Sequence, residues 1–336
     1  MKVLFIGGTG NISSSCVRLA VERGMEVFVL NRGQRACELP KGVRTIVADI
    51  HKPESVRLAL GDLRFDAVAN FIAFTPDEIE RDIALFKGRT LQYHFISSAS
   101  AYQKPVPMPF VTESSPLKNP HWQYSRNKIA CEDRLHKAFR EEDFPMVIVR
   151  PSLTYGTVWP VAIGGWSDLT LVDRIRKGGS MVVHGDGTSL WTVTHSDDFA
   201  KGFVGLLGNS TANGHAFHIT SDEVLTWDQI YTVIAEVAGV EPKLIHIPSK
   251  FLAVISPWEK ENLLGDKAHS LIFDNSKIKR FVPDFKATIN FREGAERTLA
   301  WFEAKAERQI IRADVNTSMD GYIAAWKKAM DTIKPA

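Results

Sequence analysis

The chain has 336 residues, of which 44% are hydrophobic and 24% are charged, and its formal net charge at pH 7 is +2. This composition is typical of a globular protein with a large buried core. The dispersed lysines and arginines argue against nucleic-acid binding, and no apolar run approaches the ~18 residues of a membrane span, so we expect neither partner.

The opening of the chain and its cysteines indicate a compartment. The apolar run from Lys2 to Ile6 is too short for a signal peptide and leads directly into a glycine turn. Three cysteines, an odd number without metal-like spacing, follow at Cys16, Cys37 and Cys131. We expect reduced thiols, a cytoplasmic protein and no metal site.

Short apolar runs alternate with amphipathic stretches through the first half of the chain. The runs predict strands at 2–7, 26–31, 44–49, 66–71, 92–97 and 145–150. Helices are expected at 13–24, from Pro53 onward, at 77–86 and at about 122–140. Continuous apolar strands separated by helices predict an α/β fold, a Rossmann-type doubly wound parallel sheet with right-handed crossovers.

After Arg150 the pattern changes, because residues 151–192 are rich in loop signals. Helices are expected at 195–207 and 226–239, strands at 216–220 and 243–248, and a polar helix near the end. We therefore predict an NAD(P)-binding domain over 1–155, to which 190–220 return. A smaller α/β substrate cap would occupy mainly 156–310, followed by a helical tail over 311–336.

The stretch GGTGNIS follows the first predicted strand and opens the first predicted helix. Gly7 would permit a tight turn, and Gly10 would let backbone amides approach a pyrophosphate at the helix N-terminus. The third position, where glycine is usual, is Ser13, which is small enough to keep the helix close to the strand. The pattern indicates a dinucleotide site that also includes Thr9, Asn11 and Ile12; the alternative is a plain glycine-rich loop.

The end of the second predicted strand bears on the choice of cofactor. It reads Leu30-Asn31-Arg32-Gly33, without the carboxylate that usually holds the ribose hydroxyls of NAD. Arg32 stands where a 2′-phosphate could be met, which favours NADP over NAD. The alternative is a solvated loop arginine that lies over the adenine. Asp49, with Ile50 beside it, is a candidate adenine contact after the third strand.

Tyr124 and Lys128 lie four residues apart on a predicted helix, so both side chains project from one face. An ammonium beside a phenol favours the phenolate, and we expect it to lower the pKa of Tyr124 and make it a usable acid or base. Ser98, at the carboxyl end of a predicted strand, is a candidate second donor to a substrate oxygen. The alternatives are an exposed tyrosine and lysine, and a serine that caps a turn.

Taken in order, Gly7, Gly10, Ser13, Ser98, Tyr124-x-x-x-Lys128, Arg150-Pro151 and Tyr155-Gly156 resemble the extended short-chain dehydrogenase/reductase family, in its NAD-dependent epimerase/dehydratase branch. The resemblance extends to about residue 305. It implies that Tyr124 is the catalytic acid/base, that Lys128 lowers its pKa and binds the nicotinamide ribose, and that Ser98 polarises the substrate oxygen. It also implies a cofactor lining of Asn70, Ala73, Ser97, Pro151 and Ser152. The helices at 77–86 and 122–140 would suit a homodimer interface common in the family.

The same resemblance narrows the reaction. Sugar dehydratases of the family carry Thr-Asp-Glu where this chain has Ser98-Ala99-Ser100, so dehydration is disfavoured. The run SSASAY is closer to UDP-galactose 4-epimerase-like proteins, and the first hypothesis is an NAD(P)-dependent sugar epimerase. The second is an NADP(H)-dependent reductase or dehydrogenase of a small carbonyl compound or alcohol. The third is a non-catalytic RNA-binding relative, which the balanced charge argues against.

One departure from the family concerns the substrate. After a Gly-Asp-Gly turn, where nucleotide-sugar enzymes carry a phosphate-binding arginine, this chain has Trp191. The second phosphate arginine of those enzymes, expected near residues 263–270, is also absent, with Lys267 or Arg280 as its candidate substitute. Tryptophan offers one neutral donor, so it would stack on a sugar or ring and not grip a diphosphate. We therefore expect a small-molecule substrate, a carbohydrate in the first place, with these candidate contacts: Phe74, Ser100, Trp159, Trp166, Trp191 and His195. Core or interface tryptophans and a capping histidine are the alternatives.

Overall fold

The structure, a computed structural model, describes residues 1–33 and 39–333, so Cys37 lies outside the described residues. Its central sheet has seven parallel strands in the order β12-β7-β5-β4-β1-β2-β3. Their bounds are β1 Lys2–Ile6, β2 Glu26–Asn31, β3 Arg44–Val47, β4 Ala67–Asn70, β5 Tyr93–Ile96, β7 Met146–Pro151 and β12 Ala216–Ile219. The predicted Rossmann-type doubly wound parallel sheet is confirmed.

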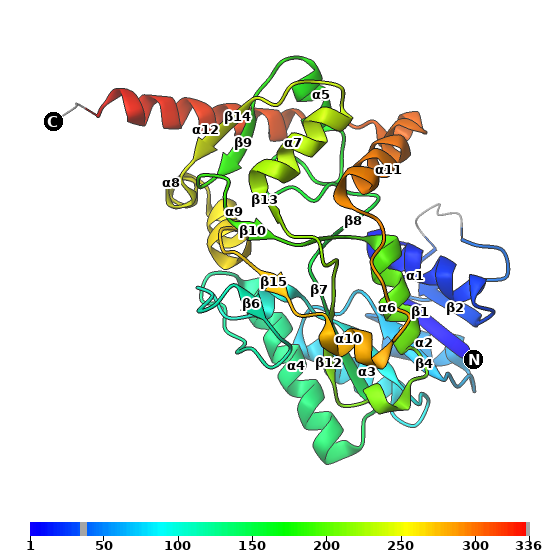
Figure 1. Cartoon of the computed structure of the whole chain (residues 1–336). Coiled ribbons are helices and arrows are strands. Elements are labelled where there is room, and N and C mark those ends of the chain that lie inside the picture. Colours follow the sequence, from blue (N-terminus) through cyan, green and yellow to red (C-terminus); the bar gives the residue numbers. More distant parts are fainter. Residues whose placement is uncertain (34–38, 334–336) are drawn as a thin grey trace.

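Helices cover both faces of this sheet (Figure 1). Alternate residues of β1 enter two different cores, Leu4 with Ile6 in one and Val3 with Phe5 in the other, as the two-residue period of a strand requires. The helices around the sheet are α1 Asn11–Glu22, α2 Pro53–Leu60, α3 Pro76–Phe86, α4 Gln123–Glu142 and α6 Ser196–Leu206. We call the sheet with these helices the sheet part.

A third hydrophobic core gathers Trp159, Trp191 and Trp227 in a second part, which we call the cap. Its main elements are β8 Leu153–Tyr155, α5 Thr170–Arg176, β9 Met181–His184, β10 Leu190–Trp191, β11 Val193–His195, β13 Leu225–Thr226, α7 Trp227–Val237, β14 Leu244–Ile247, α8 Ser249–Ile255, α9 Pro257–Glu259, the π-helical segment η3 Lys260–Lys267, α11 Phe291–Glu303 and α12 Ala313–Asp331.

The remaining short elements are the 3₁₀ turns η1 Ala99–Ala101, η2 Ser210–Ala212 and η4 Ala306–Arg308, the strands β6 Phe110–Val111 and β15 Ile272–Phe273, and α10 Ser276–Phe281. The chain thus crosses between the two parts repeatedly, since α6, β12 and α10 come after the first elements of the cap. Residues 151–192 hold more regular structure than the sequence indicates. The run MVVH becomes β9, because it is buried and pairs in parallel with β14.

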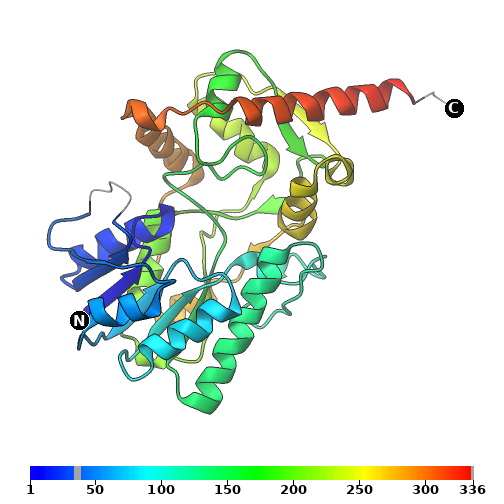
Figure 2. The ribbon, with the colours of Figure 1, turned by 180° about the vertical axis from the view of Figure 1, so that it is seen from behind.

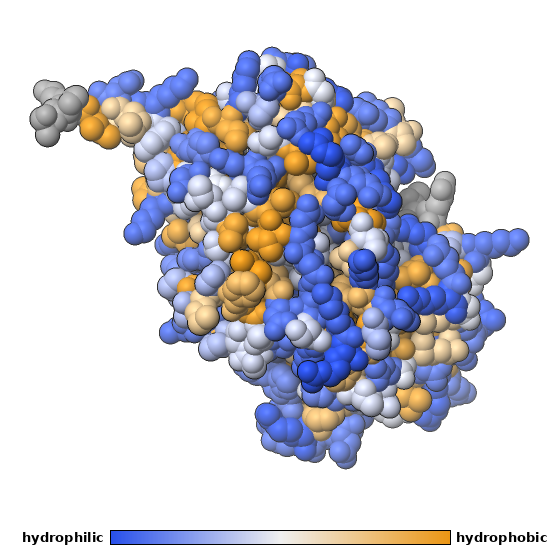
Figure 3. Space-filling model, viewed as in Figure 1, coloured by the Kyte–Doolittle hydropathy of each residue, from blue (hydrophilic) through white to orange (hydrophobic). Residues whose placement is uncertain are grey.

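Helix α12 is the last element of the chain and belongs to the cap. Figure 2 shows α12 running along the cap with its C-terminal end projecting beyond it. Figure 3 shows a mainly hydrophilic face, with hydrophobic side chains gathered near its centre.

None of the helices within the described ranges is long and apolar enough to cross a membrane. Within the same ranges, no three His, Cys, Asp or Glu side chains are placed to hold a metal ion. Cys16 and Cys131 are buried free thiols.

Candidate active site

The glycine turn joins β1 to α1 in the geometry that a dinucleotide turn needs. Gly7 has a φ of +82°, a backbone conformation that residues with a side chain rarely adopt. A Cβ at this position would also lie 2.6 Å from Cγ2 of Ile72, which is a steric clash. Ser13 takes an active part in the turn. Its hydroxyl donates to the carbonyl of Gly7 at 2.8 Å and accepts from the N–H of Gly10 at 2.9 Å. The missing third glycine is therefore replaced by two hydrogen bonds.

The N-terminus of α1 is open toward an anion. Gly10 is the N-cap and supplies no capping side chain, so the first N–H groups of the helix are left to a ligand. The side chain of Asn11 binds the protein itself. Its amide nitrogen donates to the carbonyl of Thr154, and its amide oxygen accepts from the N–H of Thr157, both at 2.9 Å. A cofactor contact by Asn11 is therefore left to its backbone N–H. Thr9 and Ile12 are partly exposed in the same turn.

The ends of β2 and β3 lie side by side where a ribose and an adenine would be expected. Asn31 accepts the N–H of Gly33 at 2.8 Å and so shapes the turn after β2. Arg32 is exposed and makes no ion pair with any residue that the structure describes. Asp49 accepts the N–H of His51 at 3.1 Å, and Ile50 is buried beside it. The exposed guanidinium of Arg32 fits the predicted encounter with a 2′-phosphate.

The three predicted catalytic residues lie together at the carboxyl end of β5 and the start of α4. Lys128 is buried, and its ammonium donates to the carbonyls of Ala73 and Ile96, each at 2.7 Å. The same nitrogen lies 5.6 Å from the ring centre of Tyr124. Ser98 begins a short 3₁₀ turn, and its hydroxyl accepts the N–H of Ser100 at 3.1 Å.

The pKa of Tyr124 differs from the sequence-based expectation. Burial raises the pKa of Tyr124 to about 12, and only a contact with the Ser98 hydroxyl acts in the opposite direction. Burial also lowers the pKa of Lys128 to about 8. The expected lowering of the tyrosine pKa is therefore wrong for the protein alone, because the ammonium is directed toward two backbone carbonyls and burial dominates. A proton held on Tyr124 suits a general acid.

Two residues predicted to line the cofactor bind to the protein instead. Asn70 is buried, donates to the carboxylate of Asp82 and accepts the N–H of Ile72 at 2.8 Å. Ser97 donates to the buried carboxylate of Glu132, so its hydroxyl is not free for a ligand.

Glu132 is also the ion-pair partner of Arg150, with distances of 3.0 and 2.6 Å between their atoms. Pro151 ends β7, and the hydroxyl of Ser152 lies 3.1 Å from that of Thr194. These residues fix the strand ends on which the site is built.

Two of the predicted substrate residues lie beside the catalytic group. The ring of Phe74 is 42% exposed, lies 6.3 Å from that of Tyr124 and covers the ammonium of Lys128 at 4.5 Å. Ser100 is buried and links Ser98 to Ser125, with hydroxyl distances of 2.9 and 2.8 Å. Phe74 is thus available to a substrate, whereas Ser100 supports Ser98.

The predicted tryptophan contacts need correction. Trp159 and Trp191 are each 1% exposed, and they pack on Phe302 and Trp227 at ring distances of 5.8 Å. They form the apolar core of the cap and offer no open face to a sugar. Trp166, in contrast, is 60% exposed. Trp191 thus places a buried apolar ring, and no cationic side chain, at the position after the Gly-Asp-Gly turn.

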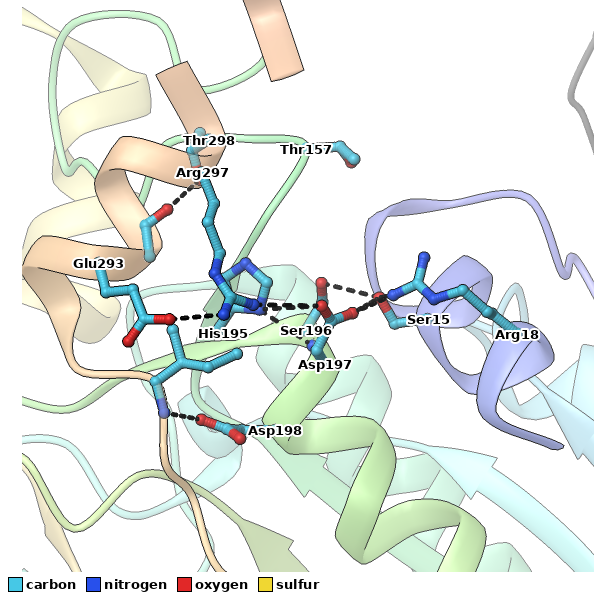
Figure 4. A network of polar contacts seen from close by, with 12 residues as sticks. Ser15, Arg18, Thr157, His195, Ser196, Asp197, Asp198, Glu293, Arg297 and Thr298 are labelled. Carbon is cyan, nitrogen blue, oxygen red and sulfur yellow. Dashed lines mark hydrogen bonds and ion pairs between the residues drawn. The ribbon is translucent and has the colours of Figure 1, made fainter. Parts of the chain in front are cut away.

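His195 has a structural position in place of the expected substrate contact. Its ring Nδ1 accepts the N–H of Asp197 at 3.2 Å and caps helix α6. Asp197 in turn contacts Arg18 and accepts from Ser15 at 2.7 Å, which ties α6 to α1. Figure 4 shows this network, with Arg297 of α11 reaching the same carboxylate at 4.0 Å. The histidine therefore helps to join the sheet part to the cap.

A charged cluster lies beside the tyrosine, and the sequence indicates only Lys267 of its three members. Lys104 and Lys267 both form ion pairs with Asp266, at 3.6 and 3.5 Å. The charge of Asp266 contributes to the raised pKa of Tyr124, so the carboxylate acts on the site. No motif connects Lys104 with Asp266 and Lys267, because Lys104 lies far from the other two in the sequence.

The chain is similar to known proteins in sequence and in fold. A model of the NAD dependent epimerase/dehydratase family matches residues 3–220. The chain is 23% identical over 302 residues to 2′-dehydrokanamycin reductase of Streptomyces kanamyceticus, covering 85% of this chain and 80% of that protein. It is 25% identical over 264 residues to the chloroplast stem-loop binding protein of 41 kDa b of Arabidopsis thaliana, covering 74% of this chain and 66% of that protein.

A solved structure gives the same picture of the fold. The UDP-glucose 4-epimerase of Thermus thermophilus, in complex with NAD, superposes with a TM-score of 0.70 at 20% identity. The superposition covers 91% of this chain and 100% of the epimerase chain. At this level of identity the likeness establishes the shared fold, and the substrate has to be argued from the residues of this chain.

Proposed function

Because the chain belongs to the NAD-dependent epimerase/dehydratase family, we propose that it transfers a hydride between NAD(P) and a carbonyl or secondary alcohol of a carbohydrate-type substrate that carries no nucleotide diphosphate. The dinucleotide supplies the hydride chemistry when it is bound. The turn of Gly7 and Gly10 would hold the pyrophosphate, Arg32 the ribose or a 2′-phosphate, and the third N–H of Lys128 a ribose hydroxyl.

The side chains of the site have complementary tasks. In reduction, Tyr124 would donate its proton to the substrate oxygen as negative charge develops there, and in oxidation it would accept that proton. Ser98 would hydrogen-bond the same oxygen and orient it. Lys128, fixed by two carbonyls, would hold the ribose in register with the substrate.

The observation that carries the substrate assignment is the burial of Trp191 in the cap core. A diphosphate needs charge-assisted donors, and the position after the Gly-Asp-Gly turn offers an enclosed indole with one neutral donor. The second phosphate arginine of nucleotide-sugar enzymes is absent from residues 263–270, and the one lysine of that segment, Lys267, pairs with Asp266 at 3.5 Å. A free sugar or another diphosphate-free carbohydrate fits this site better.

Within this function we favour an NADP(H)-dependent reductase over an epimerase. The exposed Arg32 fits a 2′-phosphate, and a cofactor taken up in reduced form has to leave after each turnover. The relative that aligns over 85% of this chain is named as a reductase and its name contains no nucleotide. The epimerase is the second candidate, favoured by the run SSASAY. The two differ in whether purified protein retains its cofactor.

Tyr124→Phe tests the chemistry. NADPH consumption would be followed with a panel of keto sugars, including keto derivatives of aminoglycosides. Loss of the general acid should lower turnover about 100- to 10,000-fold, while NADPH affinity stays unchanged. Tyr322→Phe, which alters a tyrosine of α12, is the matched control and should retain activity. A Tyr124→Phe enzyme with more than a tenth of the wild-type rate would refute the assignment.

A binding measurement tests the substrate class independently. Calorimetric titration of wild-type protein with UDP and UDP-glucose should give weak binding. Micromolar affinity for either ligand would show that other residues bind the diphosphate. The nucleotide-sugar epimerase would then be the favoured function. RNA binding by a catalytically silent protein, as the Arabidopsis relative's name suggests for that protein, would be supported by tight stem-loop binding together with no turnover on any carbonyl compound.

A further inference from the structure

Two tryptophans that no sequence motif marks lie near the catalytic tyrosine. Trp122 immediately precedes α4, and its ring centre lies 5.1 Å from that of Tyr124. Trp258 belongs to the short helix α9, and its ring centre lies 6.3 Å from that of Trp122. The three rings form a row that leads from the catalytic group to α9, which lies against the start of α4 (Figures 1 and 2).

Trp258 differs from the tryptophans of the cap core in its exposure. It is 59% exposed, whereas Trp159 and Trp191 are each 1% exposed. Because an indole is flat, exposure of this extent leaves one of its faces open. Phe74, which is 42% exposed, also contacts the ring of Tyr124. Open apolar rings thus gather around the catalytic group, and apolar surface gathered in this way marks a ligand site.

Trp122 is held in place by the protein and is half-buried. Its backbone N–H donates to Oδ1 of Asn119 at 3.0 Å, and the amide of Asn119 donates to the carbonyl of Gly265 at 2.6 Å. The ammonium of Lys267 lies over the Trp122 ring, 5.4 Å from its centre, and covers one face of it. The planes of Trp122 and Trp258 meet at 89°, so the two indoles form a corner whose open side is supplied by Trp258.

The backbone on both sides of Trp258 is anchored as well. The hydroxyl of Ser256 caps α9 by accepting the N–H of Glu259 at 3.2 Å. Glu259 is buried, and its carboxylate accepts the amide of Asn262 at 3.0 Å. The same amide donates to the carbonyl of Ala162 at 2.9 Å, which ties α9 to the cap. An exposed ring on a fixed backbone is preorganised, so binding a ligand costs it little conformational entropy.

We propose that Trp258 stacks on a second ring of the substrate, which is linked to the sugar ring that reacts at Tyr124. This inference rests on the proposed function and adds a property of the substrate, which is a glycoside and not a monosaccharide. Trp258 lies one ring beyond Trp122, so a ligand that reaches it from Tyr124 needs a second ring. The C–H face of another sugar or an aromatic aglycone supplies the flat apolar surface on which an indole stacks.

Equilibrium binding to the NADP⁺-loaded full chain tests the proposal with three uncharged probes: methyl β-D-glucopyranoside, cellobiose and phenyl β-D-glucopyranoside. At least one of the two-ring probes should bind about 10-fold more tightly than the methyl glucoside. The probe with the larger gain identifies the second ring as a sugar or an aromatic group. Trp258→Ala should remove the gain, and Trp258→Phe should keep most of it. Val254→Ala, which alters an exposed apolar side chain of α8, is the matched control and should have no effect.

The affinity for the methyl glucoside distinguishes a ring contact from a structural role. A ring contact leaves this affinity unchanged in Trp258→Ala protein. Equal weakening of all three probes in both Trp258 variants would show a structural role and overturn the proposal. Equal or undetectable binding of the three probes by wild-type protein would also overturn it. A dimer that Trp258→Ala and Val254→Ala both dissociate, without any preference for a second ring, would assign these side chains to an interface between copies of the chain and overturn it too.

The same titrations on Tyr124→Phe protein measure recognition of the second ring without turnover. A preference for two-ring probes in this protein, with no turnover of any keto sugar by wild type, would support the Trp258 contact and count against the proposed chemistry. Turnover of keto sugars without a preference for two-ring probes would support the chemistry and overturn the contact.

Discussion

Replacement of Lys128 by methionine should change the pH dependence of folding stability in a defined direction. Burial lowers the pKa of Lys128 from its ordinary value of 10.5 to about 8. The folded protein therefore binds this proton more weakly than the unfolded chain does, and the cost is fully present below about pH 8. Between pH 8 and 10.5 the folded protein releases the proton first, so wild-type stability should rise with pH relative to Lys128→Met.

The size of this effect follows from the same two values. The difference between 10.5 and about 8 corresponds to roughly 3 kcal/mol at most. The methionine variant also loses the hydrogen bonds to the carbonyls of Ala73 and Ile96, but that loss does not depend on pH. This loss changes the free energy of unfolding of the variant by the same amount at every pH. The slope of the stability difference against pH therefore reflects the titration of the ammonium. A comparison of slopes therefore isolates the titration of Lys128.

Urea unfolding of both proteins at several values between about pH 7 and 10 measures the difference directly. The free energy of unfolding of wild type minus that of the variant should be flat below about pH 8 and increase above it. A difference that stays constant across the whole range, or that falls as pH rises, would refute the claim that Lys128 is a desolvated ammonium. The ion pairs of other residues cancel, because they are common to both proteins.

Three further changes have expected outcomes. Arg32→Asp should move the cofactor preference from NADP(H) toward NAD(H), measured by calorimetry with both cofactors, and wild-type protein that already prefers NAD would contradict the assignment. Ser13→Gly restores the glycine that is usual in the family, but it removes two hydrogen bonds of the turn. It should therefore lower the free energy of unfolding by about 1–3 kcal/mol. An unchanged urea midpoint would contradict this. Glu132→Gln should cost about 3–5 kcal/mol by leaving Arg150 buried and uncompensated. The control Glu141→Gln, in an exposed pair, should cost about 0–1 kcal/mol, and similar losses in both variants would show that burial is not the cause.

The fold was accessible from the sequence because its signals are local. Most strands of the sheet part are apolar runs, with the edge strand β3 as an exception, and the helices between them carry apolar residues at helical spacing. The position of Tyr124 relative to Lys128 is likewise set by one helix. The confirmed parallel sheet needed no knowledge of distant contacts.

Side-chain direction and burial at the site depend on distant partners, and there the sequence was a weaker guide. Ser97 and Ser98 are neighbours, yet one hydroxyl is held by Glu132 of α4 and the other lies at the catalytic tyrosine. Trp191 follows a turn associated with ligands, but the tryptophan of a later helix covers it. The ion pairs of Asp266 with Lys104 and Lys267 join two remote segments, which no spacing rule connects.

The side chain of Asn11 has a mechanical consequence. One amide at the start of α1 holds both the carbonyl of Thr154 and the N–H of Thr157, the stretch by which the chain leaves the sheet part for the cap. The cofactor turn and this exit therefore form a single rigid joint. A movement of the cap relative to the sheet part would therefore have to leave both hydrogen bonds of Asn11 intact or break them together.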